Sequence, residues 1–196
     1  MNSDTGMAAF FTLHRDLVRE GPGVPEDVAW AASLADVPAD ARIADVACGP
    51  GGDIAALLAA APQGHVTALD KTAHFVTVLR ADMATIINSY DLIWCAGAVY
   101  FMGVEAALGA WRKSLGKGGV IAFSEACWFT DTPSARAKGL WAREYPSMTD
   151  TAGITAQIAA AGYEVLGQRR LSDAAWEAYF TPLDARIAAL RAGGVD

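Results

Sequence analysis

Residues 43–53 constrain the fold of this chain more than any other stretch. They read IADVACGPGGD, an apolar run of strand length that continues into glycines, and an Ala/Leu-rich helical pattern follows over residues 53–61. Glycines at such a junction let the backbone approach a ligand closely. In an open parallel sheet, ligands bind beyond the carboxyl ends of the strands. The stretch therefore predicts a strand, a cofactor-binding loop and a helix.

Strand-length apolar runs alternate with helical patterns along the rest of the chain. Strands are predicted at residues 43–47, 65–69, 76–79, 91–95, 120–125 and 163–171, and helices at 8–18, 25–35, 53–61, 105–115, 151–161 and 174–191, the last broken at Thr181 and Pro182. Continuous apolar strands that alternate with helices indicate a parallel sheet covered on both faces. The predicted fold class is α/β, doubly wound, with a mostly parallel sheet of six strands.

Composition excludes several classes of protein. The 196 residues are 53% apolar, which is too apolar for a disordered chain, and 15 basic against 22 acidic side chains give a net charge of −7. Nucleic acid and anionic membranes are therefore disfavoured as partners. The longest apolar run, residues 54–61, is far shorter than the roughly 20 residues of a membrane span. Because the first residues lack a secretory pattern, we expect a cytoplasmic protein.

The three cysteines, Cys48, Cys95 and Cys127, are separated by 47 and 32 residues. These separations match no metal-ligand spacing, and an odd number leaves one thiol over in any disulfide scheme. We therefore predict buried free thiols and no metal site.

The spacing within the glycine-rich loop distinguishes between cofactors. A dinucleotide fingerprint would need a third glycine where Ile54 stands, and a phosphate-binding P-loop would end in Gly-Lys-Ser/Thr instead of Gly51-Gly52-Asp53. Nicotinamide and flavin cofactors are thus disfavoured, although an NAD(P)-dependent oxidoreductase stays open as an alternative. A cationic cofactor without phosphate would suit the acidic residues near the loop.

Residues 43–51 resemble the first motif of the class I S-adenosylmethionine-dependent methyltransferases, with Ala47 in place of the first glycine. The resemblance covers residues 40–125 and implies the Rossmann-like fold of that family. It implies that Asp70 holds the ribose hydroxyls, that Asp82 and Met83 flank the adenine, and that Asp45 lies toward the methionine end. The implied set of cofactor-binding residues is Asp45, Ala47, Gly49, Gly51, Asp70, Lys71, Asp82, Met83, Cys95 and Ala96.

Residues 93–101 and 118–125 are similar to the small-molecule, quinone C-methyltransferase-like branch of this family. The resemblance implies in-line methyl transfer to a small-molecule acceptor, with S-adenosylhomocysteine as the product. Glu125 and His14 are the candidate bases. A helical lid is expected after the fifth strand, and the aromatic residues Tyr100, Trp128 and Tyr145 are candidates for substrate binding. A protein that binds the cofactor or a partner without turnover is the alternative.

We predict a single domain over residues 1–196, as a monomer or homodimer. A helical cap would occupy residues 1–40, the cofactor-binding core 41–125, and the lid and C-terminal part 126–196. Only six residues separate the second and third predicted strands, too few for a helical crossover. Residues absent from the sequence would explain this better than a deleted crossover. The last five residues cannot supply the antiparallel strand with which the family usually ends.

Overall fold

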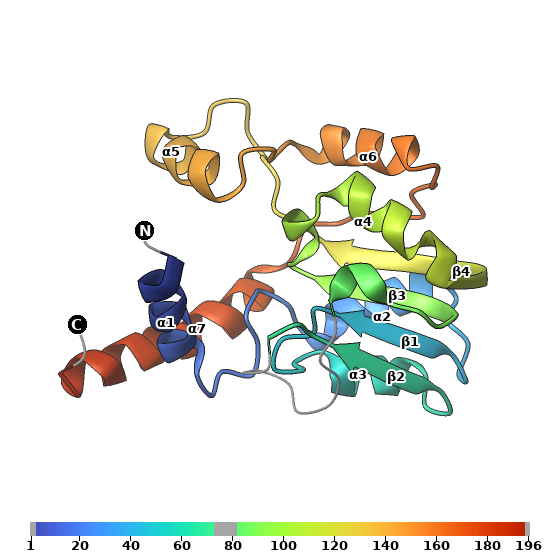
Figure 1. The fold of residues 1–196 in the computed structure, drawn as a ribbon, viewed down its shortest axis with the longest axis horizontal. Coiled ribbons are helices and arrows are strands. Elements are labelled where there is room, and N and C mark those ends of the chain that lie inside the picture. Colours follow the sequence, from blue (N-terminus) through green and yellow to red (C-terminus); the bar gives the residue numbers. More distant parts are fainter. Residues whose placement is uncertain (1–2, 73–81, 195–196) are drawn as a thin grey trace.

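The structure is a computed structural model that describes residues 3–72 and 82–194 (Figure 1). Its strands are β1 (Arg42–Val46), β2 (His65–Leu69), β3 (Tyr90–Ala96) and β4 (Leu115–Ser124). Its α-helices are α1 (Ser3–His14), α2 (Pro25–Leu34), α3 (Ile54–Ala60), α4 (Val104–Trp111), α5 (Ala135–Glu144), α6 (Thr151–Ala160) and α7 (Asp173–Ala192). Single turns of 3-10 helix lie at η1 (Met83–Thr85), η2 (Val99–Phe101) and η3 (Arg112–Ser114).

The four strands form one parallel sheet in the order β2-β1-β3-β4. In its centre, Asp45 of β1 pairs with Ala68 of β2 on one side and with Trp94 of β3 on the other. Parallel strands bring their carboxyl ends to one edge, so the loops that follow β1, β2, β3 and β4 all begin there. The predicted α/β fold with a parallel sheet is confirmed.

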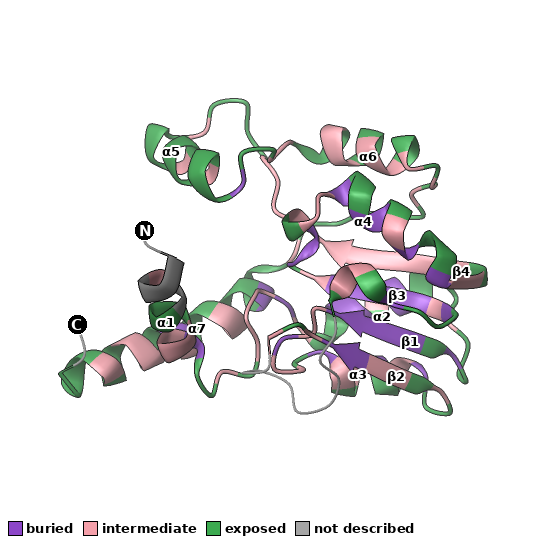
Figure 2. Ribbon diagram, viewed as in Figure 1, coloured by how far each residue is buried: buried purple, intermediate pink, exposed green. Residues whose placement is uncertain are grey.

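Alternate residues of the central strands pack into two separate apolar clusters, one on each face of the sheet. Ala44 and Ile93 belong to a cluster with Leu108 of α4 and other α4 residues, while Ile43 and Leu92 belong to a cluster with residues of α2 and α3. Figure 2 shows β1 and β3 almost entirely buried. Helices therefore cover both faces, which is why these strands read as continuous apolar runs.

Two strand predictions have different outcomes. The prediction at residues 76–79 lies outside the part of the chain that the structure describes. The prediction at residues 163–171 is wrong, because this segment has no regular secondary structure. Its side chains make contacts away from the sheet: Arg169 pairs with Asp27, and the Arg170 guanidinium lies 4.4 Å from the ring centroid of Phe129. The described sheet therefore has four strands instead of six.

The helix predictions at both ends also need correction. The first helix ends at His14 instead of residue 18, because Asp16 adopts a left-handed conformation with φ of 66° and the chain turns away. The last helix runs unbroken from Asp173 to Ala192 with Pro182 inside it. Proline removes one main-chain hydrogen bond but does not end this helix. Within residues 3–72 and 82–194, no helix is long and apolar enough to cross a membrane.

Candidate functional site

The loop after β1 has three residues in the left-handed region. Their φ angles are 57° at Ala47, 52° at Gly49 and 89° at Gly51. The Cys48 amide donates to the Leu69 carbonyl of β2 at 3.1 Å, which fixes the start of the loop. An L-residue in this conformation costs roughly 1–2 kcal/mol, so Ala47 is strained where a glycine would not be. The loop geometry is thus kept despite the alanine.

Asp70 joins this loop to the end of β2. Its Oδ2 accepts a 3.1 Å hydrogen bond from the Gly49 amide, and its Oδ1 accepts a 2.7 Å bond from the Thr72 amide. Both carboxylate oxygens are therefore oriented by the backbone, and within the described residues each accepts one hydrogen bond although it has two lone pairs. The structure brings Asp70 to the glycine-rich loop.

Asp45 is the most deeply buried carboxyl group near the loop. It is 3% exposed, and its Oδ2 has no hydrogen-bond partner among the described residues. Burial, followed by the negative charge of Asp53, raises the pKa of Asp45 to about 7, although the positive charge of Arg19 opposes this. Leaving a buried polar atom unpaired is costly. The group is therefore poised to pair with a ligand cation or hydrogen-bond donor.

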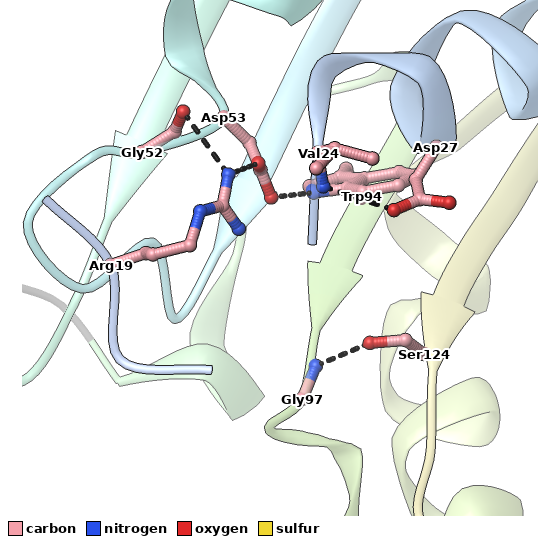
Figure 3. Close-up of polar contacts among 8 residues, drawn as sticks. All are labelled: Arg19, Val24, Asp27, Gly52, Asp53, Trp94, Gly97 and Ser124. Carbon is pink, nitrogen blue, oxygen red and sulfur yellow. Dashed lines mark hydrogen bonds and ion pairs between the residues drawn. The ribbon is translucent and has the colours of Figure 1, made fainter. Parts of the chain in front are cut away.

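The segment between α1 and α2 lies directly on the loop. A Cβ added at Gly52 would lie only 2.6 Å from the Val18 carbonyl oxygen, so no larger residue fits there. Arg19 Nη2 contacts Asp53 Oδ1 at 2.6 Å, and Trp94 Nε1 donates to Asp53 Oδ2 at 3.0 Å (Figure 3). Asp53 therefore fastens this N-terminal segment to both the loop and β3.

Glu20, which the sequence analysis did not single out, sits over the same loop. A Cβ added at Gly49 would lie 3.5 Å from the Glu20 Cγ, and the Glu20 Oε1 is buried without a hydrogen-bond partner in the described part of the chain. Burial, followed by the nearby charge of Asp70, raises the pKa of Glu20 to about 7. Its position depends on the turn at Asp16, which left no pattern in the sequence.

The residues predicted to flank the adenine lie beyond the end of β2. Asp82 is exposed and caps η1, its Oδ1 accepting a 2.9 Å bond from the Ala84 amide. Met83 packs against the core, and its carbonyl accepts a 2.7 Å bond from Trp111 Nε1. Lys71 is exposed, with Nζ 5.9 Å from the Phe101 ring centroid.

The residues at the end of β3 are small. Cys95 is buried and Ala96 is half-buried, and the Gly97 amide that follows donates to Ser124 Oγ of β4 at 2.8 Å (Figure 3). Burial raises the pKa of the Cys95 thiol, which stays protonated. Cys95 is a buried free thiol as predicted, whereas Cys48 and Cys127 are free but only half-buried.

Glu125 directly follows β4. Its Oε1 accepts a 3.1 Å bond from the Ala126 amide, while its Oε2 is buried and has no partner in residues 3–72 and 82–194. Burial raises the pKa of Glu125 to about 7, although the amides of Ala126 and Tyr100 lower it. A carboxyl group with such a pKa can gain or lose a proton near neutral pH.

The aromatic residues predicted to bind substrate gather beside Glu125. The ring centroids of Tyr100 and Tyr145 lie 5.7 Å apart, and burial, followed by the Glu125 charge, raises the pKa of both phenols. Tyr145 and Trp128 in turn line a cavity of about 230 Å³ with Trp141 of α5. The structure therefore brings Tyr100, Tyr145 and Trp128 together near the end of β4.

His14 contacts Tyr179, which in turn lies near Tyr100 and Glu20. It is 5% exposed and joins α1 to α7: Nδ1 lies 2.9 Å from the Phe10 carbonyl oxygen and Nε2 lies 3.0 Å from the Tyr179 hydroxyl. Both ring nitrogens thus have partners within the protein. In the described segments, no group of three or more His, Cys, Asp or Glu side chains could hold a metal ion.

The fold is similar to that of several solved structures. The chain is similar to an S-adenosylmethionine-dependent methyltransferase from Geobacter sulfurreducens in complex with S-adenosyl-L-homocysteine (TM-score 0.78, 19% identity, 96% of this chain and 84% of that chain). It is equally similar to one from Thiobacillus denitrificans (TM-score 0.78, 22% identity, 96% and 84%) and to YjhP from E. coli (TM-score 0.77, 18% identity, 95% and 84%). No protein-family model and no curated protein matches the sequence. The chain therefore has the Rossmann-like class I methyltransferase fold.

Proposed function

We propose that this protein is an S-adenosylmethionine-dependent methyltransferase that acts on a small-molecule acceptor. The observation that carries the proposal is the unpaired, buried carboxylate oxygen of Asp45 beside the glycine-rich loop. S-adenosylmethionine has a positive sulfonium, a positive ammonium and no phosphate. Carboxylates at this loop would favour such a ligand and disfavour a nucleotide phosphate, because opposite charges attract and like charges repel.

The residues present fit this cofactor at each of its parts. Asp70 would hold the ribose, Asp82 and Met83 would flank the adenine, and Cys95 and Ala96 would form the wall beside it. Backbone groups of Ala47, Gly49 and Gly51 would line the methionine end together with Asp45, and Lys71 would lie beside Asp70, its neighbour in the chain. Glu20, above Gly49, adds a further carboxylate that the resemblance did not include.

Bound S-adenosylmethionine supplies an electrophilic methyl group, and methyl transfer is an in-line displacement. The work of the protein is therefore to align the acceptor and to exclude water. The segment fastened by Arg19 and Asp53 covers the loop from one side. Tyr100, Trp128 and Tyr145 would orient the acceptor on the other.

Glu125 is the stronger of the two candidate bases. No described residue pairs with its Oε2, whereas both ring nitrogens of His14 are occupied by contacts within and between α1 and α7. A base must reach the proton that it removes, so an occupied imidazole is poorly suited. The similarity of residues 93–101 and 118–125 to the quinone C-methyltransferase-like branch supports a small acceptor, and the aromatic residues Tyr100, Trp128 and Tyr145 would suit a planar one.

Calorimetric titration with S-adenosylmethionine and S-adenosylhomocysteine tests the proposal. We expect both compounds to bind the parent protein and binding to fall at least about tenfold in Asp70→Ala, because a ribose diol would lose a charged hydrogen-bond acceptor. Asp40→Ala, at an exposed position, is the control and should bind like the parent. A folded parent that binds neither compound would overturn the proposal and return attention to nicotinamide cofactors. Binding without transfer to any acceptor would favour the non-catalytic alternative.

A further inference from the structure

The cavity beside α5 is walled by aromatic rings and lies next to the end of β4. Trp128, Trp141 and Tyr145 line it, with Met148 and Lys138. Its volume of about 230 Å³ is below the roughly 300–1,000 Å³ of sites for drug-sized ligands, so it suits a small molecule. Tyr145 is only 5% exposed, and its ring packs toward Tyr100. Tyr145 therefore links the cavity to Tyr100, which lies beside Glu125, while Glu125 itself does not line the cavity.

Glu125 contributes a negative charge that nothing in the described chain neutralises at Oε2. The hydroxyl of Tyr100 experiences this charge together with those of Glu144 and Glu20, and Tyr179 lies near it as well. Among the cations of this region, Lys138 lines the cavity with an exposed side chain, Lys71 is exposed, and Arg170 lies near Cys127. Solvent screens exposed charges more than buried ones. The inner part of the region is therefore electronegative.

We propose that the methyl acceptor is a small primary or secondary amine, whose ammonium group enters between the aromatic rings and pairs with Oε2 of Glu125. The inference rests on the proposed methyltransferase function and specifies its substrate class. An ammonium would give the buried carboxylate oxygen a charged hydrogen bond. Aromatic faces within about 6 Å would attract the same cation.

Every proton in methyl transfer to an amine has an acceptor when Glu125 serves as the base. The bound ammonium gives a proton to Glu125 Oε2, so an N–H bond breaks and an O–H bond forms. The neutral nitrogen then uses its lone pair to bond the methyl carbon, while the electron pair of the C–S bond stays on sulfur. The product leaves as a methylated ammonium, and Glu125 releases its proton to solvent.

A phenol or carbon acid fits the same groups less well. Deprotonation would place an anion beside Glu125, with Glu20 and Glu144 also near Tyr100. Like charges at short range raise the energy of the anion and weaken its binding. An amine instead enters as a cation and becomes neutral, so its binding and its activation both benefit from the carboxylate.

Tryptophan fluorescence can test the inference without cofactor, because Trp128 and Trp141 line the cavity. The probes are 2-phenylethylamine, 2-phenylethanol and 4-ethylphenol, which share a ring and differ in the polar group. We expect the amine to bind at least about tenfold more tightly than either neutral probe at pH 8. Glu125→Gln should reduce this preference to less than about threefold, whereas Glu105→Gln, at an exposed position of α4, should preserve it.

A second variant keeps the inference testable if Glu125→Gln does not fold. Trp141→Leu removes one aromatic wall of the cavity on the mostly exposed helix α5, and it should weaken the amine more than the alcohol. Equal binding of the amine and the alcohol, an unchanged preference in folded Glu125→Gln, or no saturable binding of the amine would overturn the inference. Cofactor titration of the same preparation tests the methyltransferase proposal separately, so either can fail alone.

Discussion

The Gly49 amide donates a hydrogen bond to Asp70 Oδ2 at 3.1 Å and thereby ties the glycine-rich loop to the end of β2. The other oxygen, Oδ1, accepts from the Thr72 amide at 2.7 Å. One carboxylate therefore orients two backbone segments and presents its remaining lone pairs between them. The residue proposed to hold the ribose also builds the loop on which the rest of the site depends.

Asp70→Asn should separate these two roles. An asparagine offers only one acceptor oxygen, so its NH₂ group would face either the Gly49 or the Thr72 amide. We expect a loss of about 1–3 kcal/mol in the free energy of unfolding, measured by urea denaturation, because one backbone donor loses its partner. Asp40→Asn should change it by less than about 0.5 kcal/mol. An unchanged stability would mean that the two hydrogen bonds do not hold the loop.

Ala47→Gly should be neutral or stabilising, by up to about 1 kcal/mol. Ala47 has φ of 57°, and glycine removes that strain while adding freedom to the unfolded chain. Ala106→Gly, an exposed position in α4, should instead cost about 1 kcal/mol. Ala47→Val should destabilise, since a β-branched residue tolerates this conformation less. Stability is measured by urea unfolding of the three variants. Equal changes in the free energy of unfolding for Ala47→Gly and Ala106→Gly would contradict backbone strain at Ala47.

The Arg19–Asp53 pair lends itself to a double-mutant cycle. Arg19→Met leaves the Asp53 carboxylate largely buried, with Trp94 Nε1 as its remaining partner. We expect this change to cost roughly 3–5 kcal/mol, as for other buried pairs that lose one member. Adding Asp53→Asn should recover part of the loss, with a coupling energy of about 1–3 kcal/mol. Strict additivity in chemical denaturation would show that the pair does not fasten the N-terminal segment.

The sequence predicted the central part of this molecule because its signals are local. The apolar run that ends in glycines identifies β1, and the carboxylates of Asp45 near the end of β1 and Asp70 after β2 follow from strand ends that meet at one edge. Residues 163–171 have an apolar start, but pairing at a sheet edge depends on a neighbour. In this segment Arg169 forms an ion pair with Asp27 of α2, and the segment does not pair with the sheet. Strand formation at such a position is not encoded in the segment itself.

Glu20 illustrates the same limit within the site. The left-handed turn at Asp16 lets Val18, Arg19 and Glu20 lie on the loop some thirty residues further along. Sequence patterns report periodicity within a segment and carry no information on which distant loop that segment covers. By contrast, Glu125 was found from sequence, because it stands directly at the end of a strand.

The stability of the ligand-free protein should fall as pH rises from 5.5 to 8. Burial raises the pKa of Asp45 to about 7, above that of an unfolded aspartate, so the folded state holds a proton that the unfolded state has lost. The extra stability that this proton gives is complete below about pH 4 and disappears as pH passes 7. For Asp45 it is at most about 4 kcal/mol over that whole range. Glu20 and Glu125 act in the same direction, but less strongly because they are less buried.

Urea denaturation of the parent and of Asp45→Asn at both pH values would measure this contribution. The variant keeps the shape of the side chain without its charge, so its stability should fall less with pH than that of the parent. Asp40→Asn, the exposed control, should follow the parent. Saturating S-adenosylmethionine should stabilise the parent more at pH 8 than at pH 5.5, because a cation favours the ionised carboxylate. The same slope in Asp45→Asn and the parent would mean that Asp45 does not titrate in this range.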